Sequence, residues 1–280
     1  MTAQRTGHHQ PRPPQRYTGP YTTPLLILAA IALLTLLAPA LAPYDPRHAL
    51  SGQSLAPPSP AHPLGTDALG RDVLSRTLWG GRQTLSMALL ATAIAIGPGL
   101  LVGLLAGYLG GWPDRVLMGG MDILLAFPNL LLALTFISLI GTGSVQVALA
   151  VGIAGLPAYA RVARTAVLRV RNQPYIEAAQ AIGARPHRIL VYHVLPNALE
   201  TLLSFAVVSL SWALLNGAAL VFLGFGGDPA TPDWGAMLNE GRTAFRVAPW
   251  IALPPGIAIT LTVFAINRLV DSWQDALNGQ

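Results

Sequence analysis

Residues 84–109 read TLSMALLATAIAIGPGLLVGLLAGYL, a stretch without a charged side chain. A helix of about 20 apolar residues is long enough to cross the hydrocarbon core of a bilayer. Gly99, Gly103 and Gly107 recur every four residues within it, so they share one face of the predicted helix. Small residues on one face let a second helix approach closely inside a membrane. The stretch therefore predicts a membrane-spanning helix that packs tightly against a neighbour.

The composition extends this prediction to the whole chain. Of its 280 residues, 52% are hydrophobic and 10% are charged, and the mean hydropathy is +0.51. Soluble domains usually carry about 25% charged residues. Length alone would permit one or two soluble domains, but the deficit of charge indicates that most of the surface does not face water.

Two missing amino acids exclude several chemistries. The sequence contains no cysteine and no lysine, so all 17 basic residues are arginines. Disulfides, zinc–thiolate sites and thiol catalysis are excluded, and so are Schiff-base chemistry and a P-loop lysine. The net charge of +5 could suggest nucleic acid, but arginines that gather in the cytoplasmic loops of a membrane protein explain it better.

Further apolar runs bring the predicted number of spans to six. They are residues 23–42, 116–140, 145–163, 199–225 and 251–269. The first run is longer than the core of a signal peptide, which has about 7–15 residues, so we interpret it as an uncleaved helix. Pro128 lies inside a span, where it frees a carbonyl group and kinks the helix. The kink is either a gating point or a consequence of helix packing. Together the six predicted spans indicate an all-α membrane protein.

Polar segments separate these spans. Residues 1–22 are rich in proline, arginine and histidine and are predicted to form a disordered tail. Residues 43–82 and 226–248 are polar connections, and the end of the first, residues 67–82, has the spacing of a short amphipathic helix on the membrane surface. Such a helix either contacts a partner or is only structural. Four of its charged residues are spaced for helix salt bridges, namely Asp67, Arg71, Asp72 and Arg76.

The distribution of arginines predicts the orientation. Six spans place both ends of the chain on one side of the membrane. With the N-terminus inside, the cytoplasmic segments hold 11 of the 17 arginines, and six of these lie in residues 161–196. Because short cytoplasmic loops are enriched in arginine, both ends are predicted to be cytoplasmic.

The segment 161–196 is too polar to span a membrane and too periodic to be a loop. Asn172 is a plausible helix cap, Pro174 suits a first turn, and Gly183 can end the helix in a left-handed conformation. Glu177 lies near the positive end of the helix dipole. A short helix of small residues can insert into a groove of a partner, and an ordinary interfacial helix is the equally plausible alternative.

A second helix is predicted to follow this one, from Pro186 to Leu195. The same region resembles the cytoplasmic EAA signature of inner-membrane subunits of binding-protein-dependent ABC importers. The residues that carry this resemblance are Glu177, Ala178, Ala179, Gly183, Leu195 and Pro196. His193 stands where the general pattern often has isoleucine, and this departure resembles the dipeptide, oligopeptide and nickel branch.

Segments elsewhere in residues 24–278 resemble the same branch. They are residues 62–67 (HPLGTD), 69–76 (LGRDVLSR), 159–161 (YAR), 222–225 (FLGF) and 234–238 (WGAML). Residues 270–278 (VDSWQDALN) depart from it. The resemblance implies a MetI-like, type I permease fold of about six spans with a coupling helix at 172–196. It also implies three parts, a tail (1–22), a first helix with a periplasmic connection (23–82) and a permease core (83–280).

The resemblance further implies how the chain works. The coupling contact to a separate ATPase subunit would comprise Glu177, Ala178, Ala179, Gly183, His193, Leu195 and Pro196. Expected partners are a homologous second permease subunit, two ATP-binding subunits, an extracytoplasmic solute-binding protein and the lipid bilayer, without nucleic acid. The chain itself would perform no catalysis and bind no cofactor, because ATP and Mg²⁺ would bind to the partner subunits. Its cargo would be a peptide, a nickel complex, glutathione or a metallophore.

Two other functions are possible on the residues alone. An ion-gradient-driven carrier often has inverted repeats and buried charges at mid-membrane, and neither is evident in this sequence. An intramembrane enzyme needs a catalytic dyad at depth, which is also not evident. The adjacent His8 and His9 are not expected to bind a metal, and Asp122 and Glu200 are expected near the cytoplasmic ends of spans.

Overall fold

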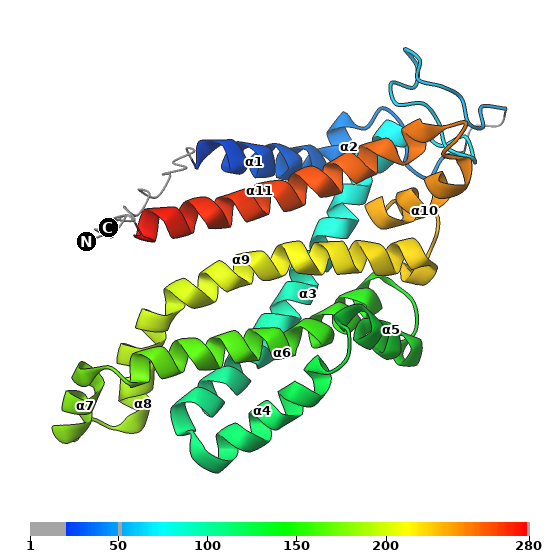
Figure 1. Ribbon diagram of the computed structural model, residues 1–280. Helices are drawn as coiled ribbons and strands as arrows, with labels where there is room; N and C mark the ends of the chain where they lie inside the picture. Colours follow the sequence, from blue (N-terminus) through cyan, green and yellow to red (C-terminus); the bar gives the residue numbers. More distant parts are fainter. Residues whose placement is uncertain (1–20, 50–51, 279–280) are drawn as a thin grey trace, which may run out of the picture.

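The computed structural model describes residues 21–49 and 52–278, and the regular elements within these ranges are helices. They form an elongated bundle (Figure 1). The predicted all-α membrane fold is confirmed. Most of the predicted tail, residues 1–20, lies outside the described part of the chain, as do His8 and His9.

Four helical stretches in the described ranges are long and apolar enough to cross a membrane. They are Val73–Leu109, Ser144–Arg171, Pro186–Phe225 and Pro249–Asp275. The first two are the helices α3 and α6. The third joins α8 (Pro186–Ile189), a π-helical turn (Leu190–Val194), α9 (Leu195–Leu220) and a second π-helical turn (Val221–Phe225). The fourth joins a 3₁₀ turn (Pro249–Ile251) to α11 (Leu253–Asn278).

The first predicted span is shorter than expected and interrupted. Helix α1 (Thr22–Leu36) has 15 residues, and the four-residue α2 (Ala38–Leu41) follows after Leu37. Pro39 lies in the first turn of α2, and a proline lacks the N–H that would continue the ladder of α1. The two helices together cover about 30 Å at 1.5 Å per residue.

The third predicted span is broken rather than kinked. Helix α4 (Gly111–Leu125) and helix α5 (Asn129–Ile140) meet at an angle of 91°. Pro128 is the residue before α5 and has an extended conformation, with φ −56° and ψ 130°. The sequence located the break correctly but underestimated its size. Gly110 alone separates α3 from α4, which begins at Gly111.

Helices α3 and α6 form the most extensive contact in the bundle. The predicted glycine face of α3 lies in this contact. A Cβ atom on Gly99 would lie 3.0 Å from the carbonyl oxygen of Leu156, and one on Gly107 would lie 2.9 Å from that of Arg164. A Cβ on Gly103 would collide with the backbone of Ala160. The glycines therefore allow backbone-to-backbone packing, as the sequence predicted.

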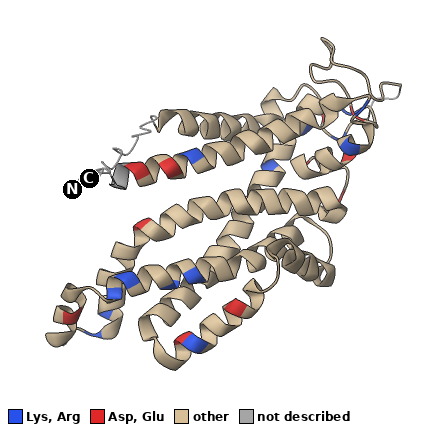
Figure 2. Cartoon of the chain, in the orientation of Figure 1, with Lys and Arg blue, Asp and Glu red and all other residues tan. Residues whose placement is uncertain are grey.

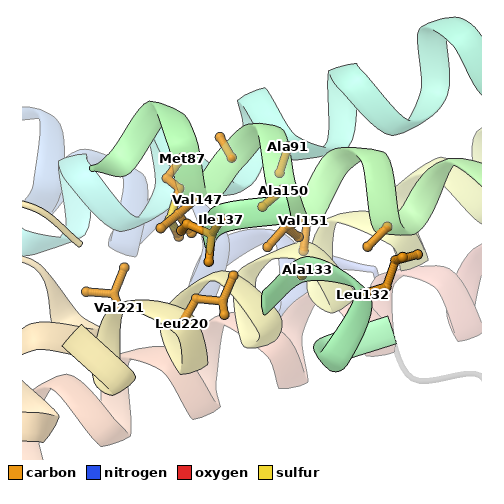
Figure 3. Packing of buried hydrophobic residues seen from close by; sticks show 13 residues of the cluster. Met87, Ala91, Leu132, Ala133, Ile137, Val147, Ala150, Val151, Leu220 and Val221 are labelled. Atoms are coloured by element: carbon orange, nitrogen blue, oxygen red, sulfur yellow. The ribbon is translucent and has the colours of Figure 1, made fainter. Parts of the chain in front are cut away.

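The apolar core lies where α3, α5, α6 and α9 meet. Buried apolar side chains from all four helices pack together there, with many alanines and valines among them (Figure 3). Ala133 and Ile137 on α5 and Val147 and Val151 on α6 are each at most 1% exposed. This packing holds the short broken helix α5 inside the bundle.

The predicted surface helix at residues 67–82 is wrong. Helix α3 begins at Val73, because the side chain of Asp72 caps it by accepting a hydrogen bond from the N–H of Ser75 at 2.8 Å. The preceding residues form a folded loop in which Gly65 and Gly70 have positive φ angles of 71° and 76°. A glycine adopts such angles without the steric penalty of a Cβ. Helix α3 runs without interruption across residues 82 and 83, where the predicted permease core begins. The division of the chain into a tail, a first helix with its connection and a permease core stays a prediction.

Helix α10 (Trp234–Ala244) was not predicted. It lies within the polar connection 226–248 and is capped by Asp233, whose carboxylate accepts hydrogen bonds from the N–H groups of Gly235 and Ala236. Trp234 is buried, and its indole N–H donates to the carbonyl of Thr77 at 2.8 Å. It therefore anchors α10 to α3 and is not an exposed interfacial residue.

The bundle has two distinct ends (Figure 1). The α7 end comprises α7 (Pro174–Ala181), α8, the first residue of α1 and the last turn of α11. The α10 end comprises α10 and the described parts of the connection before α3, residues 43–49 and 52–72. Charged residues gather toward these ends and between α4 and α6, and the middle of α9 carries none (Figure 2).

Candidate functional site

The short helix α7 stands at the tip of the α7 end (Figure 1). Pro174 occupies its first turn, as predicted, and Glu177 is an acid in that turn. The predicted cap Asn172 is wrong, because Asn172 ends α6 and Gln173 precedes α7 without a side-chain cap. A carboxylate at the positive end of the helix still favours its start.

Gly183 ends α7 in the left-handed conformation that the sequence predicted, with φ of +82°. The N–H of Gly183 bonds to the carbonyl of Gln180 at 2.9 Å, and the N–H of Ala184 bonds to that of Ala179 at 3.1 Å. This pair of bonds is a Schellman motif, which satisfies the last carbonyl groups of a helix. No atom of the described residues lies within 4 Å of a Cβ built on Gly183, so the turn is open on its outer side.

One face of α7 is buried and the rest is open. Ile176 is fully buried, whereas Glu177 and Ala178 are exposed and Ala179 is half-buried. Ile182, beside the turn, is 86% exposed. An apolar side chain so exposed, at the tip of the molecule, is available to a partner surface.

Three apolar residues fasten α7 to the long helix that follows it. Ile176 on α7, Ile189 on α8 and Val194 in the π-helical turn belong to one buried cluster, which continues into α6 and α9. None of them was among the predicted site residues. Their signal was present as isolated apolar positions in a polar, arginine-rich segment. Because the cluster is continuous, a force on α7 passes to α9 through packed side chains.

The other predicted site residues lie where α8 passes into α9. Pro196 has no N–H, and its ring would crowd the carbonyl group four residues earlier. The wider π-helical turn at Leu190–Val194 accommodates it. His193 and Leu195 are half-buried and Pro196 is exposed. The predicted residues thus form two groups, one on α7 and one at this turn, joined by the buried cluster and not by direct polar contact in the described structure.

Ion pairs hold α4 against α6 near the same end. Arg164 donates to both carboxylate oxygens of Asp114 at 2.5 and 2.6 Å, and Arg161 donates to Asp122 at 2.5 Å. The Asp122 pair is more than half exposed, and Glu200 is exposed. Glu200 lies near the start of α9, whereas Asp122 lies beside the break between α4 and α5; their predicted placement near the cytoplasmic ends of spans stays a prediction. Exposed pairs of this kind contribute little stability, about 0–1 kcal/mol.

The α10 end differs, because three of its charged residues are buried and form ion pairs with one another and with the partly exposed Glu240. Arg71 Nε donates to Asp67 at 2.6 Å, and its Nη2 donates to Glu240 on α10 at 2.9 Å. Arg76 Nη2 donates to both oxygens of Glu240 at 3.0 Å. We call Asp67, Arg71, Arg76 and Glu240 the buried ion network. It connects the loop before α3, α3 itself and α10.

Two more polar contacts close the α10 end. His62 Nδ1 lies 2.9 Å from Asp72 Oδ1, and both residues are buried. Thr84 donates to Asp233 at 2.9 Å, which joins α3 to the start of α10. Burial raises the pKa of the Asp233 carboxyl, and the hydrogen bonds from Thr84, Gly235 and Ala236 oppose that shift. Most of the buried polar groups named here are paired within the chain, although Nε and Nη1 of Arg76 form no hydrogen bond to the described residues.

Comparison with known proteins adds independent information. Residues 99–279 match the family of binding-protein-dependent transport system inner membrane components. The chain is 41% identical over 255 residues to the glutathione transport system permease protein GsiD of Pectobacterium atrosepticum, covering 91% of this chain and 84% of the relative. It is 41% identical over 260 residues to the di/tripeptide transport system permease protein DppC of Pseudomonas aeruginosa, covering 91% and 86%.

A solved structure has a similar fold. A chain of the MetNI methionine ABC transporter, in an inward-facing conformation, superposes with a TM-score of 0.57. The match covers 71% of this chain and 96% of that chain at 21% sequence identity. At this identity the likeness concerns the fold alone.

Proposed function

This chain belongs to the family of binding-protein-dependent transport system inner membrane components and is a permease subunit of an ABC importer, and we propose that it couples to a separate ATPase subunit through α7 and carries short peptides. Members of this family work with ATPase and substrate-binding partners, and the permease is not itself catalytic. ATP and Mg²⁺ would bind to the partner subunits and not to this chain.

One observation carries the coupling proposal. The open helix α7 is fixed by Ile176 to the start of the helical stretch Pro186–Phe225, which is long enough to cross the membrane. Inserted into a groove of an ATPase, α7 would move with that subunit. The long stretch would carry the movement to the middle of the bilayer as a rigid body. Glu177, Ala178, Ala179 and Gly183 would form the contact, with His193, Leu195 and Pro196 at the base.

The cargo proposal rests on the two relatives named above, whose names specify glutathione and di- or tripeptides. Glutathione is itself a tripeptide, so both names indicate a short chain of amide-linked residues. Nickel complexes and metallophores, which the sequence left open, receive no support from these relatives. The chain would lie in the inner membrane with α7 and both termini on the cytoplasmic side.

The proposed assembly contains two homologous permeases, two ATPases and an extracytoplasmic binding protein. It is tested by reconstituting the chain alone and with these partners in liposomes, with labelled alanylalanine and S-methylglutathione as probes. Only the complete assembly should take up a probe, and only with ATP. Uptake by the chain alone, driven by an ion gradient, would instead identify a secondary transporter and contradict the proposal.

A further inference from the structure

A small cavity lies inside the bundle between α3, α5, α6 and α9, with a volume of about 150 Å³. Most of its wall is apolar and includes Ala91 and Val151, two residues of the buried core that Figure 3 labels. Four of the lining side chains carry polar groups, namely Thr92, Asn129, Ser209 and Trp212. None of the lining residues is charged.

The polar groups of this cavity lie at a depth in the membrane where polar side chains are uncommon. Ser209 and Trp212 lie near the middle of the stretch Pro186–Phe225, so they would lie near the centre of a bilayer. Tryptophan is enriched at the membrane–water interfaces. Polar groups at mid-membrane depth are stable only where they face protein or a water-filled space. The face of α9 that bears these residues therefore faces away from lipid.

The polar groups leave both donors and acceptors for another molecule. Thr92 and Ser209 each donate their hydroxyl proton to a carbonyl of their own helix, at 2.8 and 2.7 Å, which leaves their oxygens as acceptors. In ranges 21–49 and 52–278, Trp212 accepts a hydrogen bond from the Asn216 side chain only through its backbone carbonyl, so its indole N–H is left without a partner, as is the side-chain amide of Asn129. Gly155 makes room for the indole, because a Cβ there would lie 3.3 Å from the ring.

The cavity adjoins a second, more polar cleft of about 310 Å³ between α6, α9 and α11. Phe205 and Val208 line both spaces. Glu200, Thr201 and Ser204 line only the cleft, on the half of α9 nearer the α7 end. The ring of Phe205 lies 5.8 Å from that of Tyr159. Phe205 therefore stands between the two spaces, and polar positions follow α9 from the cleft to mid-membrane.

We propose that the cavity is a binding subsite for one uncharged amide-bearing segment of the cargo. The Trp212 indole and the Asn129 amide would donate to a peptide carbonyl, and the oxygens of Ser209 and Thr92 would accept from a peptide N–H. At about 30 Å³ per water, the cavity holds roughly five waters, enough for one residue and not for a tripeptide. The cargo would continue along α9 past Phe205 into the cleft. This inference rests on the proposed import of short peptides.

The lack of cysteine in the chain permits a direct test in the complete reconstituted transporter. Ser209→Cys places one thiol in the cavity, and Leu203→Cys places one on an exposed position of α9 that lines neither space. A small water-soluble thiol reagent, scored by the mass of this chain, should modify Ser209→Cys at least tenfold faster. Saturating alanylalanine or S-methylglutathione should slow that reaction several-fold.

A second measurement tests the hydrogen bond itself. Trp212→Phe keeps an aromatic ring but removes the N–H, so the KM for the transported peptide should rise about tenfold, which corresponds to the loss of one buried hydrogen bond. Leu203→Ala is the control and should leave KM unchanged. An unchanged KM in Trp212→Phe would overturn the assigned hydrogen bond.

The remaining outcomes separate this inference from the proposed function. If the complete transporter imports a peptide but Ser209→Cys reacts no faster than Leu203→Cys, or is not protected by that peptide, the subsite is wrong and the proposed function stands. If the chain does not assemble with an ATPase, or the assembly imports no peptide, the proposed function fails and the subsite fails with it.

Discussion

The two ends of this molecule differ in how far their charged and apolar side chains are buried. At the α10 end, Arg76 is fully buried and its guanidinium meets acids from two other segments. At the α7 end, Ile182 is 86% exposed and a Cβ on Gly183 would meet open space. Both regions are folded by local caps and turns. The charged residues of the α10 end pair mainly with one another, whereas the α7 end leaves an apolar side chain and an open turn exposed, as the proposed coupling contact requires.

The largest expected effect concerns orientation, because the two ends are predicted to lie on opposite sides of the membrane. Reporter fusions after Gly143 and Pro229, toward the α10 end, should give an all-or-none signal for the outer side. Fusions after Asn172 and Gln280 should give the signal for the cytoplasm, because the arginines concentrate there. A cytoplasmic signal at Pro229 would reverse the proposed orientation.

The next largest effect should be a loss of protein stability when a charge of the buried ion network is removed at the α10 end. Arg76→Ala leaves Asp67 and Glu240 to share Arg71 alone, so two carboxylates depend on one guanidinium and the second positive charge of the network is lost. Removing one member of a buried ion pair costs about 3–5 kcal/mol. The detergent-purified variant should therefore melt well below the parent protein, and less of it should reach the membrane.

Arg242→Ala is a matched control at the same end. Arg242 is exposed and lies 5.6 Å from the ring centroid of Phe222, a contact of about 1 kcal/mol or less. A loss as large in Arg242→Ala as in Arg76→Ala would show that burial of the ion network is not what stabilises this end.

At the α7 end, a substitution should abolish coupling and leave folding nearly intact. Gly183→Asp adds strain on the order of 1–2 kcal/mol from the positive φ, but the new side chain has room within the chain. Its carboxylate would lie in the proposed ATPase contact, where an unpaired charge is costly. The membrane level should be close to normal, while co-purification of the ATPase and peptide uptake are lost.

Gly183→Asn separates charge from strain, because asparagine has nearly the same size and tolerates the left-handed conformation. It should retain more uptake than Gly183→Asp. Normal assembly and uptake in both variants would remove α7 from the coupling contact.

The sequence predicted the features that depend only on residues close to one another in the sequence. The glycine face of α3 and the turn at Gly183 follow from spacing and local conformation. The buried ion network could not be predicted, because Glu240 is 164 residues from Arg76. Three of its four charged residues, Asp67, Arg71 and Arg76, were therefore predicted to lie on a short surface helix, which the structure does not contain.

Two further features were missed for related reasons. Proline chemistry marks the position of the break between α4 and α5, but the packing of α5 against α6 sets its angle of 91°. Helix α10 was missed because it is short and polar, and Trp234 holds it in place through contacts distant in sequence. The mid-membrane cavity likewise draws its polar residues from three helices.

The most direct test of the difference between the ends is photocross-linking in the assembled transporter. A photoreactive residue replaces Ile182 at the α7 end or Val247, which is 67% exposed at the α10 end. Irradiation should yield an adduct with the ATPase subunit from position 182 and none from position 247. An ATPase adduct from position 247, or none from position 182 in an assembly that imports peptide, would contradict the assignment of α7 as the coupling surface.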